Sequence, residues 1–148
     1  MNPNTAAIDN RTAPYAAFLL RVSLGLLFIA HGLILKVFTF GIAGTVGYFE
    51  SLGYPGLFAY LVILGEIGGG LALILGLWTR WISLLMVPIL IGATLQHTGN
   101  GWLFSAANGG WEFPAFWTVT LIVQALLGDG AFALRQPVAA AVRAEALR

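Results

Sequence analysis

The sequence contains no cysteine among its 148 residues. Without cysteine the chain forms no disulfide, carries out no thiol exchange and offers no thiolate ligand to a metal ion. Iron–sulfur clusters are excluded as well, because cysteine thiolates hold them. Any redox role must therefore use other groups in this chain or a partner protein.

Charged residues are also scarce. They make up 9% of the chain, against about a quarter of an average soluble domain, while 59% of the residues are hydrophobic. This composition predicts an integral membrane protein whose main partner is the lipid bilayer. The formal net charge of +1 argues against a nucleic-acid partner, which would require a basic surface.

Four apolar segments are candidates for membrane-spanning helices, at about residues 14–35, 58–77, 81–97 and 114–127. Twenty helical residues rise by about 30 Å, which matches the hydrocarbon core of a bilayer. We therefore expect an all-α membrane protein, a four-transmembrane-helix bundle over residues 14–130.

Three further segments lie outside these spans. Residues 1–13 are polar and read as an N-terminal tail. Thr45 and Gly53 are placed to begin and end a short outer interfacial helix from Val46 to Leu52. Residues 131–148 are rich in alanine and predict a C-terminal cytoplasmic helix that starts near Pro137.

Glu66 stands out because it is the one charged residue of the 58–77 segment. A charge at this depth costs a few kcal/mol unless a partner or water supports it, so it is a functional-site candidate. Gly65, Gly69, Ala72 and Gly76 fall on one face of the same helix, at spacings of four, three and four. This small-residue face predicts close approach of a neighbouring helix, with Glu66 at its edge.

The first apolar segment carries Arg21 near its start and His31 near its end, and Lys36 is predicted to close it. Arg21 shares a helical face with Gly25, Phe28 and Gly32, so this face should point into the bundle. Two states are open for Glu66: a carboxylate paired with Arg21, or a neutral acid hydrogen-bonded to groups such as His31. In the first state the pair would fix helix register, and in the second Glu66 would transfer protons or bind a ligand.

Lysine and arginine are placed unevenly at the ends of the spans, and positive flanks stay in the cytoplasm. Lys36 alone marks the outer side, and Arg21 lies in the inner half. We therefore expect both termini in the cytoplasm. The cytoplasmic flanks contain Arg11, Arg80, Arg135, Arg143 and Arg148.

Gln96 and His97 end the third span and complete the intramembrane candidates, although His97 also suits an interfacial position. Glu50, Asn108 and Glu112 are outer-surface candidates, and Glu112 also suits the start of a helix. No metal-ligand spacing such as HExxH is present, and no metal site is predicted.

Several short motifs occur in an order that resembles the DoxX family, covering the four spans and both outer segments. They are Leu20-Arg21, His31-Gly32, Phe49-Glu50-Ser51-Leu52-Gly53, Gly65-Glu66-Ile67-Gly68-Gly69, Gly76-Leu77-Trp78-Thr79-Arg80 and Asn108-Gly109-Gly110-Trp111-Glu112-Phe113-Pro114. The resemblance implies a bacterial-type inner-membrane four-helix protein. Some members of the family are small subunits of thiosulfate:quinone oxidoreductase, and others associate with sulfurtransferase or superoxide dismutase in oxidative-stress complexes.

Three functional classes remain open. A redox-associated subunit would bind a quinone through groups such as His31, Glu66 and Gln96, with no covalently bound cofactor and with electrons from a soluble or membrane partner. A non-catalytic adaptor would dock a soluble protein. A carrier of a small molecule or proton would need a homo-oligomer, because a monomer with four spans and no visible inverted repeat is unlike known transporters. The resemblance favours the first class, as part of an oxidoreductase and not as a complete enzyme.

Overall fold

The computed structural model describes residues 8–134, and all regular structure in this part of the chain is helical. The first helix, α1 (Ala13–Ile29), continues without a break into a π-helical segment, η1 (Ala30–Thr39). The short helix α2 (Gly41–Ser51) follows. Three further helices complete the bundle: α3 (Leu57–Leu75), α4 (Thr79–His97), extended by the 3₁₀ turn η2 (Thr98–Asn100), and α5 (Glu112–Leu127).

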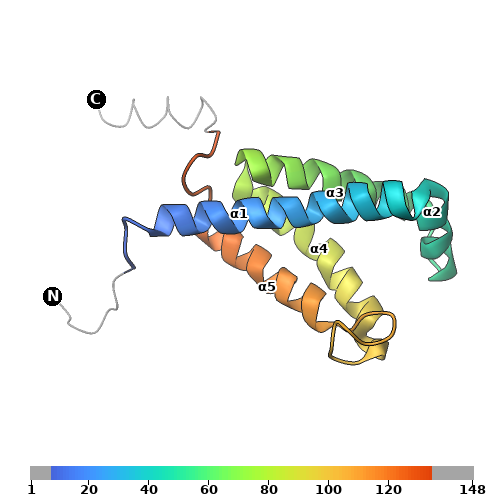
Figure 1. Ribbon diagram of the computed structural model, residues 1–148. Helices are drawn as coiled ribbons and strands as arrows, with labels where there is room; N and C mark the ends of the chain where they lie inside the picture. Colours follow the sequence, from blue (N-terminus) through green and yellow to red (C-terminus); the bar gives the residue numbers. More distant parts are fainter. Residues whose placement is uncertain (1–7, 135–148) are drawn as a thin grey trace.

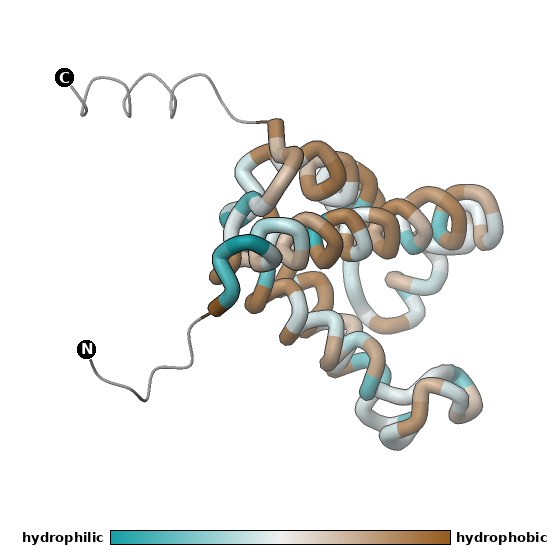
Figure 2. Tube along the Cα trace, turned by 60° about the vertical axis from the view of Figure 1, so that its left-hand side comes forward, coloured by the Kyte–Doolittle hydropathy of each residue, from teal (hydrophilic) through white to brown (hydrophobic). Residues whose placement is uncertain are grey.

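Three of these helices are long and apolar enough to cross a membrane. They cover Ala13–Thr39, Leu57–Leu75 and Thr79–Asn100. The fourth, α5, is apolar but has 16 residues, which rise by about 24 Å. Figure 2 shows hydrophobic residues along the helices and the strongest hydrophilic stretch at the start of the described chain.

The helices form two antiparallel pairs. In Figure 1 α1 runs beside α3, α4 runs beside α5, and the two pairs meet at one end and diverge toward the other. We call the end where they meet the termini end, because Ala131 there donates its N–H to the carbonyl of Pro14 at 2.9 Å. Between the pairs lies an apolar cluster made of Leu24, Phe28, Leu73, Met86, Leu90, Trp117 and Leu121.

Glycine allows α3 to pack closely on two sides. A Cβ added to Gly70 would lie 2.8 Å from the carbonyl oxygen of Gly25 on α1. A Cβ added to Gly69 would lie 2.6 Å from the sulfur of Met86 on α4. The predicted small-residue face therefore does meet a neighbour, at Gly65 and Gly69, but a second close contact runs through Gly70.

Several helix boundaries differ from those predicted. The first helix does not end at Lys36 but continues to Thr39, because the backbone changes to i→i+5 bonding instead of stopping. The short helix α2 covers Gly41–Ser51, not Val46 to Leu52, and Thr45 lies inside it. Thr45 cannot cap this helix, since its hydroxyl lies 2.9 Å from the carbonyl oxygen of Lys36 and 3.0 Å from that of Gly41.

The C-terminal segment is described as far as Leu134. Ala131–Leu134 is not helical and crosses the termini end, where Leu134 donates its N–H to the carbonyl of Leu75 at 2.9 Å. Phe132 packs edge-on against Phe18, with 5.1 Å between ring centroids. The predicted cytoplasmic helix from Pro137 lies outside the described residues.

Candidate functional site

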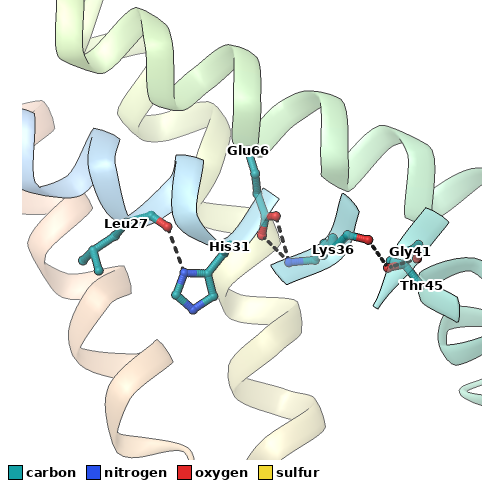
Figure 3. Close-up of polar contacts among 6 residues, drawn as sticks. All are labelled: Leu27, His31, Lys36, Gly41, Thr45 and Glu66. Carbon is teal, nitrogen blue, oxygen red and sulfur yellow. Dashed lines mark hydrogen bonds and ion pairs between the residues drawn. The ribbon is translucent and has the colours of Figure 1, made fainter. Parts of the chain in front are cut away.

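Glu66 forms a buried ion pair with Lys36, not with Arg21. Both carboxylate oxygens accept a hydrogen bond from Lys36 Nζ, at 2.9 and 2.8 Å (Figure 3). The side chain of Glu66 is 5% exposed and that of Lys36 is 19% exposed. A pair of opposite charges is neutral as a whole, so it can lie in an apolar environment that a single charge cannot.

The register of α1 against α3 explains why Arg21 cannot be this partner. A Cβ added to Gly32 would meet the Cβ of Glu66 at 2.8 Å, so Glu66 lies opposite Gly32. Arg21 is eleven residues away from Gly32, about 16 Å along the helix. Of the two states left open for Glu66, the carboxylate paired with Arg21 is therefore not the one observed, because Arg21 lies too far along the first helix and Lys36 takes the place of the partner.

The π-helical segment η1 brings His31 and Lys36 toward the same face. An i→i+5 bonded segment holds more residues per turn than an α-helix, so residues five apart come nearer to one face, whereas in an α-helix they are about 140° apart around the axis. His31 and Lys36 are five residues apart and lie in η1. Figure 3 shows His31 near the Lys36–Glu66 pair.

His31 is fixed by a backbone carbonyl and two aromatic rings. Its Nδ1 lies 2.8 Å from the carbonyl oxygen of Leu27, and a carbonyl only accepts, so Nδ1 carries the proton. Nε2 remains for other chemistry. The imidazole is 4.9 Å from the ring of Trp117 and stacked 6.2 Å from the ring of Phe113, between centroids.

Arg21 joins three chain segments at the termini end. Its Nη1 donates to the carbonyls of Leu73 and Ile74 at 2.6 and 2.7 Å, and its Nη2 donates to that of Ala131 at 3.1 Å. The first two carbonyls belong to the last turn of α3, where a positive charge is favoured by the helix dipole. Arg21 is fully buried, and this role is structural.

An open groove lies at the N-terminal end of α5, next to the loop that precedes this helix. Its volume is about 520 Å³, within the range of small-molecule sites. Phe113 connects the groove with the region of His31, because Phe113 lines the groove and also stacks on the imidazole of His31. The lining consists of Trp102, Phe104, Glu112, Phe113, Ala115, Phe116 and Val119.

The remaining predicted residues do not join Glu66. Gln96 is exposed and donates to the hydroxyl of Tyr54 at 3.1 Å. His97 packs on the outer loop, with Nδ1 3.0 Å from the carbonyl oxygen of Gly109. Glu112 accepts the N–H of Phe104 at 2.9 Å and so shapes the groove wall.

Glu50 is exposed on α2, and Asn108 is exposed on the loop before α5. Asn108 has a φ of +68° and accepts a hydrogen bond at its carbonyl from the side chain of Asn100, at 3.1 Å. Within residues 8–134, no three His, Asp or Glu side chains gather closely enough to hold a metal ion.

Lys36 is the functional candidate that the sequence analysis missed. It was interpreted as the polar end of a span, a common place for lysine. One signal was available: Lys36 is the only lysine in the chain, next to an apolar segment that must pack against a helix with a lone acid. The π-helical turn that directs it inward has no comparable signature.

The sequence can be compared with those of known proteins. The model of the DoxX family matches residues 16–99. The chain is 34% identical over 125 residues to the Bacillus subtilis (strain 168) protein named "Putative oxidoreductase CatD", which covers 84% of this chain and 88% of the relative. It is 35% identical over 97 residues to the Escherichia coli (strain K12) protein named "Inner membrane protein YqjF", covering 64% and 72%. No solved structure matches significantly. The chain is a membrane protein that belongs to the DoxX family.

Proposed function

We propose that this protein is a redox-associated subunit that binds a quinone ring in the outer aromatic groove. The observation that carries the proposal is the shared position of Phe113, which forms part of the groove and stacks on His31. A bound ring would thus lie one aromatic side chain away from a histidine and close to the Lys36–Glu66 pair.

The chemistry of the groove suits a flat, lipid-soluble ring with carbonyl acceptors. Aromatic walls favour stacking. Phe116 and Val119 are exposed on the outer face of α5, so a lipid-soluble molecule reaches the groove from within the bilayer. Behind Phe113, Trp117 is 4% exposed, and its indole N–H has no hydrogen-bond partner among residues 8–134.

Protons and electrons would come from different sources. His31 stacks on Phe113 of the groove wall, and its Nε2 is not used in the bond to Leu27, so this imidazole is the candidate for proton transfer beside Glu112 of the groove itself. The sequence has no flavin, haem or dinucleotide motif, so a partner protein would supply electrons. The name of the relative from B. subtilis, an oxidoreductase, is consistent with such a complex.

We further propose that α5 is a fourth span, so that the chain crosses the inner membrane four times. An even number of crossings leaves both ends of the described chain on one side, and the arginine-rich flanks place that side in the cytoplasm. The groove would then open at the outer surface. The relative from E. coli is named an inner membrane protein, which supports the location.

The proposal is tested by titrating detergent-solubilised protein with a short-chain quinone and following quenching of tryptophan fluorescence. We expect saturable quenching, because Trp102 lines the groove. Phe116→Ala should weaken binding about tenfold, the effect of losing one aromatic contact.

Leu126→Ala is the matched control. Leu126 is 75% exposed on the same helix, comparable to Phe116 at 68%, but it does not line the groove. The Leu126→Ala variant should bind quinone with the same affinity as the unaltered protein. Equal quinone affinities for the unaltered protein and both variants, or quenching that does not saturate, would contradict the proposal. Copurification of a soluble protein instead of a quinone would favour the adaptor.

A further inference from the structure

Four polar side chains at the termini end each bury a polar atom without a partner in the described part of the chain. Arg21, Thr79, Ser83 and Gln124 are all 0% exposed. The unpartnered atoms are Arg21 Nε, Thr79 Oγ1, Ser83 Oγ and Gln124 Oε1. Buried polar groups without hydrogen bonds are costly and uncommon, so four of them in one region call for a common partner.

The register of α1 and α5 brings Arg21 and Gln124 to one level. The rings of Phe28 and Trp117 meet across these antiparallel helices, with 4.5 Å between centroids. Arg21 is seven residues before Phe28, and Gln124 is seven residues after Trp117. Arg21 and Gln124 therefore lie on the same helix faces as Phe28 and Trp117. Both are about two turns, or 10.5 Å, nearer the termini end than the contact between those two rings.

The register of α3 and α4 adds the two hydroxyls. Gly69 contacts Met86, and Gly76 and Thr79 lie seven residues further toward the termini end on these two helices. Gly76 touches Arg21, since a Cβ there would lie 2.7 Å from Nη1. Thr79 is therefore level with Arg21. Ser83 lies one turn away on the same face as Thr79.

The other polar atoms of Arg21 and Gln124 are already engaged. The Nη atoms of Arg21 donate to backbone carbonyls, and Gln124 Nε2 donates to the carbonyl of Gly128 at 2.8 Å. A carbonyl accepts only, so this bond fixes the orientation of the amide and leaves Oε1 for the buried layer.

The donor and acceptor pattern selects the ligand. Arg21 Nε only donates and Gln124 Oε1 only accepts, while the two hydroxyls do both. A bare anion cannot donate to Oε1, and a cation cannot accept from Nε. A molecule with both an O–H and a lone pair satisfies all four groups. We infer that the layer of Arg21, Thr79, Ser83 and Gln124 is an internal water-binding site.

The surroundings would hold such waters in place. Ala131–Leu134 crosses the termini end and is bonded to Pro14, Leu75 and Arg21. On the other side lies the apolar cluster, including Leu24 and Leu121, which separates the layer from His31 and Glu66. Water in this layer ties α1, α4 and α5 together at the end where both helix pairs meet.

Removal of one hydroxyl tests the inference, because the sign of the change in Tm distinguishes a hydrated layer from a dry one. If water bonds to Thr79, Thr79→Val loses a hydrogen bond, and Tm in detergent falls by about 2–4 °C. If the layer is dry, the same change removes an unsatisfied hydroxyl, and Tm stays constant or rises. Ser83→Ala should behave in the same way as Thr79→Val.

Thr118→Val is the matched control. The hydroxyl of Thr118 donates to the carbonyl of Pro114 in its own helix at 2.8 Å and needs no water. Its removal should leave Tm nearly unchanged. A rise or no change in Tm for both Thr79→Val and Ser83→Ala would overturn the inference.

Nuclear magnetic resonance detects the water directly. Magnetisation transfer from water should reach the Nε–H of Arg21 in the intact protein and should weaken in Thr79→Val. The methyl groups of Leu90, buried in the apolar cluster and farther from the termini end, serve as the dry reference. Absence of transfer to Arg21 Nε–H would also overturn the inference.

Discussion

At the scale of single residues, the central feature is that Glu66 pairs with Lys36, whereas the sequence analysis had left open Arg21 and groups such as His31. Lys36 reaches Glu66 because its long aliphatic stem can lie along apolar surface while its ammonium group meets the carboxylate. Arg21 instead binds the carbonyls that end α3. The two intramembrane cations therefore have separate tasks, one electrostatic and one in helix capping.

This separation predicts a specific pattern of rescue. Glu66→Gln or Lys36→Met alone leaves one buried charge without its partner, a loss on the order of 3 kcal/mol in the free energy of unfolding. The double variant removes both charges and should recover most of this loss. Thermal unfolding in detergent measures the effect.

Combining Glu66→Gln with Arg21→Met provides the control. Arg21 does not contact Glu66, so its removal should add destabilisation through the lost carbonyl bonds. Recovery in this combination, with none from Lys36→Met, would show that Arg21 is the partner of Glu66 after all.

At the scale of helices, α3 is the element on which the bundle is assembled. It packs on α1 through Gly70 and on α4 through Gly69, while the preceding Gly68 is exposed and has no atom within 4 Å of an added Cβ. Three consecutive glycines thus face three different environments, as a helix of 3.6 residues per turn requires.

A leucine placed at each position should separate these environments. Gly70→Leu introduces a side chain where Gly25 and Ile29 already fill the space, so it should lower Tm strongly and reduce the yield of folded protein. Gly68→Leu introduces the same side chain but changes only the exposed face of α3. Similar Tm values for the two variants would show that the α1–α3 contact is not close.

At the scale of the whole molecule, both ends of the described chain lie at the termini end. The backbone bond between Ala131 and Pro14 joins them. Arg80 is the second residue of α4, which begins at this end, whereas Ser51 ends α2 and Ser105 lies in the loop between η2 and α5, both away from this end. This arrangement makes the orientation in the membrane measurable.

The absence of native cysteine makes labelling simple. With the chain in intact cells, a cysteine introduced at Ser51 or Ser105 should react with a membrane-impermeant thiol reagent, while one at Arg80 should not. All three positions are exposed, so burial does not explain a difference. Labelling at Arg80 and not at Ser51 would reverse the proposed orientation.

The sequence by itself determined the class of protein and most of the helices. Low charge and long apolar segments are properties of composition, and helical periodicity is local, so both can be read without knowing what packs against what. The face of Arg21, Gly25, Phe28 and Gly32 is buried as expected.

Only the tertiary structure decided which polar groups meet. The partner of Glu66 depends on the register between helices whose contacting residues are about thirty positions apart, and on a π-helical segment that turns Lys36 inward. The acceptors of Arg21 are backbone carbonyls of α3 and the C-terminal segment, which have no sequence signature. Periodicity assigns each side chain to a face, but pairing requires the positions of two helices relative to each other, and only their packing sets these positions.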